Sequence, residues 1–134
     1  RPFRAAIDEE TESVESEHIR LAKGDIKGSL VHQRFSYLAR GRYVEQLDRW
    51  MRYFPKKKMY ITTTERFARE TQTVCSEIFD FLGMTPVKIH KVKRYNAHDY
   101  EPLNLSDEKW LADYFLPFNC KLADSYGVNI DEWT

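Results

Sequence analysis

The sequence predicts a mainly α-helical chain with one or two short strands, arranged as part of a layered α/β protein. Apolar residues recur at helical spacing on both sides of a short β-prone run, Met59 to Thr62. In α/β domains, a short buried strand is covered by the helices that flank it in the sequence. Because one strand cannot form a sheet, the other strands must come from elsewhere.

The composition fits one globular domain. The chain has 134 residues, of which 42% are hydrophobic and 14% aromatic, which argues against disorder. Lysine and arginine number 21, and so do aspartate and glutamate. Zero net charge excludes a global attraction to nucleic acid or to an anionic membrane, so an anion site would have to be local. No apolar run is long enough to predict a membrane span. The first residue is Arg1, which favours a segment of a longer protein.

Residues 1–36 are predicted to form a helical region. A weak apolar stripe at helical spacing marks the first helix: Phe3, Ala6, Ile7, Val14, His18 and Leu21. Five glutamates between residues 9 and 17 are typical of a solvated helix surface. Gly24 and Gly28 indicate a loop, and a second helix is expected over residues 30–39.

Residues 37–83 are predicted to form the core, as helix, strand and helix. The first helix has one apolar stripe: Tyr43, Leu47, Trp50, Met51 and Phe54. Pro55 should end this helix. On its exposed face we expect ion pairs one turn apart: Glu45–Arg49 and Asp48–Arg52.

The strand leads into the second helical part of the core. Thr63 or Thr64 can cap a short helix, and Glu65 suits the positive end of its dipole, so we interpret Glu65 as structural. The next helix has an apolar face: Val74, Cys75, Ile78, Phe79, Phe81 and Leu82. Gly83 then predicts a left-handed helix cap.

Residues 84–105 contain the most basic window of the chain: Lys88, His90, Lys91, Lys93, Arg94 and His98. As a bare cluster of charges, this window suits a solvated loop as well as an anion site. Residues 106–134 are predicted to form the final helix and tail. We expect Ser106 to cap that helix and Pro117 to kink it.

The cysteines and histidines predict no metal site. Cys75 and Cys120 lie in apolar helical patterns, where two buried thiols are expected, although the pattern leaves a disulfide between them open. No spacing of cysteine and histidine suits a metal ion. The four histidines are scattered, and we assign none of them a catalytic role.

In their order and spacing, the motifs of the core resemble the C-terminal portion of the PAPS-dependent sulfotransferases (PAPS is 3′-phosphoadenosine 5′-phosphosulfate). The likeness is to the bacterial enzymes related to the glycosaminoglycan sulfotransferases. It is carried by these motifs: Gly41-Arg42-Tyr43, Leu47-Asp48-Arg49-Trp50, Phe54-Pro55, Met59 to Thr62, Glu65-Arg66-Phe67 and Phe81-Leu82-Gly83. The resemblance implies that residues 1–134 are part of one domain with a three-layer, P-loop-like α/β fold. It also implies a cytoplasmic location if the protein is bacterial.

The resemblance implies binding residues for both substrates. In such enzymes a basic loop closes over the 3′-phosphate of the nucleotide, which implies these cofactor contacts: Lys91, Lys93, Arg94 and Tyr95. The glycine usual in that loop is missing here, so side chains would have to make the contacts. Arg40, Arg42 and Tyr43 are the implied acceptor contacts. A guanidinium matches a sulfated or carboxylated acceptor, or the donor's phosphates. Solvated arginines, or arginines paired with nearby acids, are the plainer interpretation.

The implied activity is transfer of a sulfuryl group from PAPS to the hydroxyl of a carbohydrate or small molecule. The phosphosulfate-binding loop and the catalytic base of the family lie upstream of the portion that this chain resembles. Some relatives carry a histidine near Gln46, but glutamine cannot act as a base, so we assign no catalytic residue. The 134 residues alone are expected to be inactive.

Two other classes compete with the transferase. One is a non-catalytic helical module for protein interaction. The other is an RNA-contacting module that uses the basic loop, but zero net charge argues against nucleic acid as a partner. A chain with an exposed strand edge and apolar helix faces would also tend to self-associate.

Overall fold

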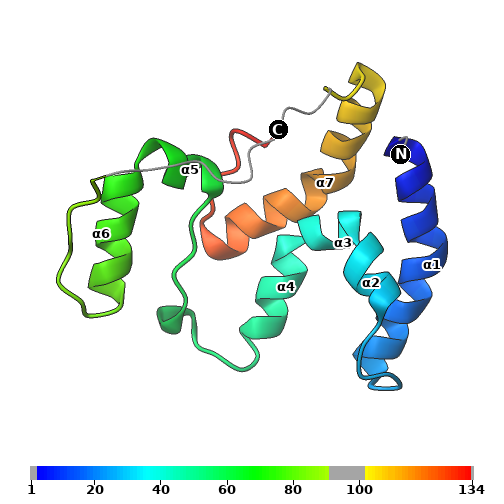
Figure 1. The fold of residues 1–134 in the computed structure, drawn as a ribbon, viewed down its shortest axis with the longest axis horizontal. Helices are drawn as coiled ribbons and strands as arrows, with labels where there is room; N and C mark the ends of the chain where they lie inside the picture. The colour runs from blue at the N-terminus through cyan, green and yellow to red at the C-terminus, as the bar shows by residue number, and fades with distance from the viewer. Residues whose placement is uncertain (1–2, 91–101, 134) are drawn as a thin grey trace.

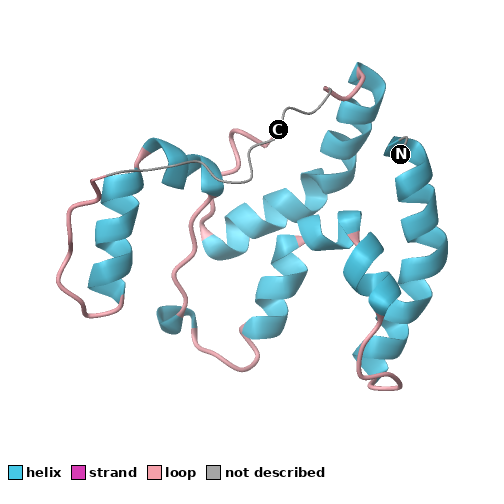
Figure 2. Cartoon of the chain, viewed as in Figure 1, coloured by secondary structure: helices cyan, strands magenta, loops and turns pink. Residues whose placement is uncertain are grey.

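The computed structural model describes residues 3–90 and 102–133, and every regular element in these ranges is a helix (Figure 2). The elements in chain order are α1 (Phe3–Lys23), α2 (Leu30–Phe35), α3 (Tyr37–Gly41), α4 (Tyr43–Trp50), the 3₁₀ helix η1 (Lys56–Lys58), α5 (Thr64–Arg69), α6 (Thr71–Phe81) and α7 (Leu105–Tyr126). No described helix has the length and apolar character needed to cross a membrane.

The helices form an open arrangement. In Figure 1, α1 and α6 lie at opposite ends of the molecule, with α4 and α7 between them. Helix α2 packs along α1, and α4 packs against α7. The buried apolar residues of this larger side come from four helices: Ile7, Val14, Leu38, Val44 and Leu122.

A buried glutamate joins α1 to α3. Glu10 is only 5% exposed, and its carboxylate accepts hydrogen bonds from the amides of Leu38 at 2.7 Å and Ala39 at 3.0 Å. These amides belong to the first turn of α3 and have no partner within that helix. A negative charge there is also favoured by the helix dipole. The predicted acidic surface of α1 therefore includes one glutamate that holds the fold together.

Helix α7 is tied to α1 at its beginning and bends in its middle. The Arg4 guanidinium lies 2.5 Å from the Asp107 carboxylate and stacks over the ring of Trp110. Asn104 is the N-cap and accepts from the Asp107 amide, so the prediction of Ser106 as the cap was wrong by two residues. Pro117 lies inside α7, which bends along its length in Figure 1 as expected from a missing amide donor.

At the other end of the molecule, α5 and α6 pack on each other. The Thr63 hydroxyl caps α5, as predicted, by accepting from the Arg66 amide at 3.1 Å. Arg66 and Glu77 form a bidentate ion pair at 2.6 and 2.9 Å, and Tyr60 donates to the same carboxylate. Gly83 has a φ of 68°, which confirms the left-handed cap after α6.

The predicted fold class was wrong. Met59 has an extended backbone, but Met59 to Thr62 pair with no other described segment, and the described residues contain no strand and no α/β layers. The β-prone side chains explain the extended backbone, yet a strand needs a hydrogen-bonded neighbour. Met59, Ile61 and Thr62 instead line a hollow whose opposite wall includes Leu47 and Trp50 of α4. The P-loop-like three-layer fold is therefore not seen in the described chain.

The predicted faces of α4 were also partly wrong. Three residues of its expected core stripe are about half exposed: Tyr43, Trp50 and Phe54. The buried residue of α4 is Val44, which is 1% exposed. Both cysteines are free thiols, Cys75 half-buried and Cys120 exposed, so the expected burial of Cys120 is wrong as well.

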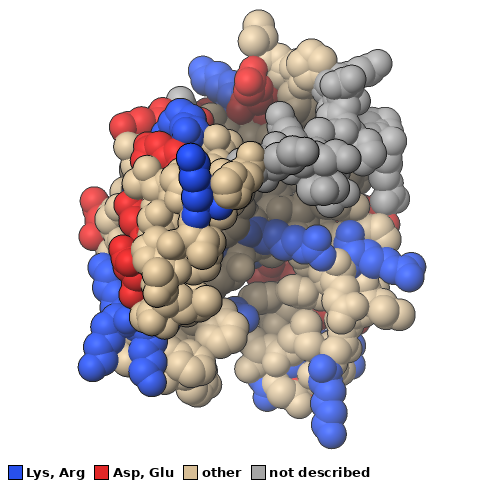
Figure 3. All heavy atoms as spheres, turned by 60° about the vertical axis from the view of Figure 1, so that its left-hand side comes forward, with Lys and Arg blue, Asp and Glu red and all other residues tan. Residues whose placement is uncertain are grey.

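Charge is dispersed over the surface. On the face shown in Figure 3, acidic and basic side chains occur in small groups among neutral ones, as expected from the zero net charge. The three lysines of η1 are exposed.

Candidate functional site

The structure tests only part of the predicted site. Lys91, Lys93, Arg94 and Tyr95, the predicted nucleotide contacts, lie outside the described residues. The predicted acceptor contacts lie around the junction of α3 and α4: Arg40, Arg42 and Tyr43. Both helices contribute to the walls of two different hollows. The three predicted acceptor contacts are therefore close in the chain but do not share one pocket.

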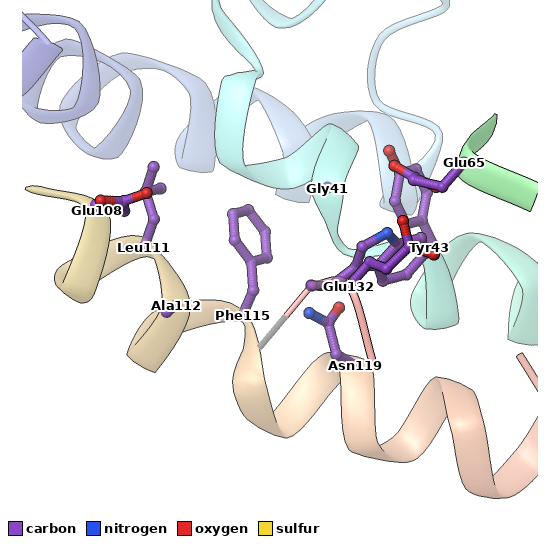
Figure 4. A pocket seen from close by; sticks show the side chains of 10 residues that line it. Gly41, Tyr43, Glu65, Glu108, Leu111, Ala112, Phe115, Asn119 and Glu132 are labelled. Carbon is purple, nitrogen blue, oxygen red and sulfur yellow. The ribbon is translucent and has the colours of Figure 1, made fainter. Parts of the chain in front are cut away.

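Tyr43 lines a cavity of about 480 Å³, which we call the tyrosine cavity (Figure 4). Its ring packs against that of Trp133, with 6.0 Å between the ring centroids. The remaining walls come mainly from α7 and the α5 N-terminus: Glu65, Glu108, Leu111, Ala112, Phe115, Asn119 and Glu132, with Gly41 opposite. Three of these residues are carboxylates, which makes the cavity unsuited to an anion.

Gly41 is needed where α3 meets α7. A Cβ atom at this position would lie 2.6 Å from the ring of Phe115, which points toward Gly41 in Figure 4. A residue without a Cβ lets the chain approach this aromatic side chain closely. The close approach fixes the distance between the two helices that line the tyrosine cavity.

Glu65 lies at the edge of the tyrosine cavity near Tyr43. Hydrogen bonding to backbone and to Trp133 lowers the pKa of its carboxyl, while burial acts in the opposite direction. Glu65 is therefore ionised at neutral pH, and a lowered pKa makes it a weaker base. This agrees with a structural role for Glu65.

Arg40 and Arg42 line a second hollow, on the other side of the α3–α4 junction. Together with a neighbouring hollow it forms what we call the arginine cleft, lined by His18, His32, Arg40, Arg42, Arg49 and Arg52. The two hollows measure about 220 and 500 Å³ and share His18, His32 and Arg49. Residues from α1, α2 and α4 meet here, although α1 and α4 are far apart in sequence.

Arg42 is the most enclosed of these arginines. Its side chain is 18% exposed, and its guanidinium lies 3.6 Å from Glu45 and over the ring of Phe118. The buried Nε of Arg42 has no hydrogen-bond partner. Arg40 is exposed and donates to the carbonyl of Gln33. Arg42 thus has a nearby acid as its partner and Arg40 a backbone carbonyl, and both arginines line the cleft.

Two arginines of the cleft were missed by the sequence analysis. Arg49 and Arg52 were expected to pair with Glu45 and Asp48, but these acids pair elsewhere. Glu45 faces Arg42, while Asp48 accepts from Lys121 and Tyr126, both at 2.6 Å. Among the described residues, Arg49 and Arg52 have no ion-pair partner. The signal in the sequence was their three-residue spacing at the end of α4, which could not reveal what lies opposite.

The two histidines of the cleft face each other. The Nδ1 of His18 lies 3.2 Å from the Nε2 of His32, and the rings stack with centroids 5.4 Å apart. Burial lowers the pKa of His32, and the nearby His18, Arg40 and Arg49 lower it further. The described residues contain no group of three metal-ligating side chains.

Comparison with known proteins identifies the family. The sulfotransferase domain matches residues 9–104. A relative, the membrane-associated sulfotransferase kil1 of Dictyostelium discoideum, is 32% identical over 99 residues, which cover 74% of this chain and 21% of the relative. The chain thus spans about a fifth of that protein's length. No solved structure matches.

These findings correct one prediction and confirm another. The expected cytoplasmic location of a bacterial protein is contradicted, since the relative comes from Dictyostelium and is described as membrane-associated. The resemblance to sulfotransferases is confirmed at the level of the family, because the matched residues include all of α2 to α6 and most of α1. The chain belongs to the sulfotransferase domain family.

Proposed function

We propose that this chain is part of an enzyme that transfers a sulfuryl group from PAPS to the hydroxyl of a carbohydrate or small molecule. The match of the sulfotransferase domain to residues 9–104 carries the proposal. That range contains every predicted contact residue of the nucleotide and the acceptor: Arg40, Arg42, Tyr43, Lys91, Lys93, Arg94 and Tyr95.

The two hollows suit different parts of the reacting molecules. The tyrosine cavity, with three carboxylates, would accept the uncharged, hydroxyl-bearing part of an acceptor beside Tyr43. Anionic groups fit the arginine cleft, where Arg40 and Arg42 lie. In this assignment Lys91, Lys93, Arg94 and Tyr95 hold the 3′-phosphate of PAPS.

The chemistry is an in-line transfer at sulfur. The acceptor oxygen forms a bond to sulfur while the bond from sulfur to the nucleotide oxygen breaks, and adenosine 3′,5′-bisphosphate leaves. The hydroxyl proton passes to a base, and cations stabilise the charge on the leaving oxygen. We assign the base to no described residue, since the lowered pKa of Glu65 makes it a weak one. The 134 residues by themselves are expected to bind without turnover.

Titration of the chain with adenosine 3′,5′-bisphosphate, followed by calorimetry, tests this proposal. We expect saturable binding that is lost in Arg94→Ala, because a guanidinium to phosphate contact is charge-assisted. Lys88→Ala is the matched control, since Lys88 is an exposed cation of the same basic window outside the predicted contacts. Binding should be nearly unchanged in that variant.

Other outcomes would identify the competing classes. Binding of single-stranded oligonucleotides with a salt slope of several phosphates would favour an RNA module. Binding of neither ligand would favour a protein-interaction module and would contradict the transferase. Loss of nucleotide affinity to the same degree in Lys88→Ala would show a diffuse charge effect and no specific site.

A further inference from the structure

The arginine cleft concentrates positive charge in a protein whose net charge is zero. Four arginines and two histidines line it, while Glu45 is the only carboxylate among its lining residues. The four arginines come from one stretch of the chain, residues 40–52, around α3 and α4, while the two imidazoles are brought to the same cleft by α1 and α2. An anion in the cleft would meet these guanidinium groups together with the two imidazoles.

The partners of the neighbouring acids explain why these arginines are available. Asp48 is turned toward α7, where Lys121 and Tyr126 hold its carboxylate. Glu10 is buried against the α3 amides, and Glu17 accepts from Ser29. Arg49 and Arg52 therefore form no ion pair in the described chain. Both side chains are exposed and could reach a charged partner. Unpaired cations that converge on a hollow are the usual form of a local anion site.

The side chains that line the arginine cleft are suited to bind a tetrahedral oxyanion. Each guanidinium presents two parallel N–H groups that match two oxygens of a sulfate or phosphate. Imidazoles such as His18 and His32 can donate a further hydrogen bond. The buried Nε of Arg42 has no hydrogen-bond partner among the described residues, so this guanidinium is not saturated by the protein.

We propose that the arginine cleft binds a sulfate or phosphate ester group that the acceptor already carries. The assignment of this group to the acceptor rests on the sulfotransferase function proposed above. The tyrosine cavity lies on the other side of the same α3–α4 junction, with Tyr43 next to Arg42 in the chain. The acceptor is then an anionic molecule, anchored by its ester group in one hollow while its hydroxyl-bearing part lies near the other.

The test follows the histidine side-chain resonances of the 134-residue chain by NMR. The probes are inorganic sulfate, inorganic phosphate and glucose 6-sulfate, at constant ionic strength. Chloride, a monatomic anion, and glucose, which is uncharged, are the comparisons. We expect saturable shifts of His18 and His32 with the three oxyanions only. Arg49→Gln and Arg52→Gln should each weaken binding about tenfold, the loss of roughly one charge-assisted hydrogen bond.

The matched control is Arg34→Gln, which removes the same charge from an exposed position on α2 outside the cleft. Its affinity for the oxyanions should equal that of the unmodified chain. Equal weakening in Arg34→Gln and Arg49→Gln, or shifts that do not saturate, would overturn the cleft as a site. All three arginines are exposed, so the variants are expected to fold, and circular dichroism checks this.

A parallel titration with adenosine 3′,5′-bisphosphate separates the two proposals. If Arg49→Gln weakens glucose 6-sulfate binding and leaves the nucleotide affinity unchanged, the ester group belongs to the acceptor. If Arg49→Gln weakens nucleotide binding as well, the cleft serves the donor and the acceptor assignment is wrong. If the nucleotide does not bind while the sulfate ester does, the transferase proposal fails and the ester site stands.

Discussion

Two regions of the molecule differ in how their helices are held. The side formed by α1–α4 and α7 is joined by buried groups: five apolar residues and the Glu10 carboxylate. The α5–α6 side has one buried apolar residue, Val74, and a partly exposed network of Tyr60, Arg66 and Glu77. Figure 1 shows α6 apart from the other long helices. The arginine cleft lies wholly in the first region, and most of the tyrosine cavity wall comes from it too, with Glu65 added from α5. Buried contacts are thus concentrated where side chains must be positioned.

The largest effect is expected from Glu10→Ala. It leaves the amides of Leu38 and Ala39 without an acceptor at a buried place, which should lower the free energy of unfolding by about 3 kcal/mol. Urea denaturation measures the loss. Glu12→Ala, at an exposed position of the same helix, should cost less than about 0.5 kcal/mol. Similar losses in both variants would show that Glu10 does not join α1 to α3.

Matched truncations at Val44 and Val74 compare the two regions directly. Both valines are almost fully buried, and each truncation should cost about 2 kcal/mol of local stability. Amide hydrogen exchange should rise across α1–α4 and α7 for Val44→Ala, but only in α5 and α6 for Val74→Ala. If Val74→Ala accelerates exchange throughout the chain, the two regions unfold as one unit.

The smallest effect is expected from the pH dependence of the α5–α6 network. Hydrogen bonds from Arg66 and then Tyr60 lower the pKa of Glu77 to about 2, from an ordinary value of 4.5. A lowered carboxyl pKa stabilises the fold above pH 4.5, and this contribution is lost as the pH falls toward 2. Exchange in α6 should therefore accelerate across that range. The effect is modest because both side chains are over a third exposed.

Glu77→Gln is the comparison for the pH effect. It should exchange faster in α6 at neutral pH and show a weaker dependence between pH 4.5 and 2. A variant with the same pH profile as the unmodified chain would mean that other carboxyls control the opening of this region.

The sequence predicted local structure better than it predicted packing. The Thr63 cap and the left-handed Gly83 follow from side-chain chemistry within a few residues, and both are confirmed. The Met59 to Thr62 strand was wrong because strand formation depends on a partner segment that local propensity cannot supply. The half-exposed Trp50 shows the same limit, since its helical spacing was right but the expected buried face was not.

The residues that line the candidate site were also predicted only in part. Arg40 and Arg42 were found by family resemblance, and the structure places both in one hollow. Arg49 and Arg52 were missed because the expected i,i+4 pairs are only weakly favoured on a helix surface, and contacts with Arg42 and α7 replace them. His18 and His32 are 14 residues apart and meet only because α2 folds back along α1.

Trp133 lies where its fluorescence can report the binding of a ligand. Its indole lies against the Tyr43 ring and borders both the tyrosine cavity and the neighbouring hollow at Leu47 and Trp50. The emission spectrum of an indole depends on the polarity and the quenchers around it. A molecule that enters either space would alter the light that Trp133 emits, so acceptor candidates can be screened without a label.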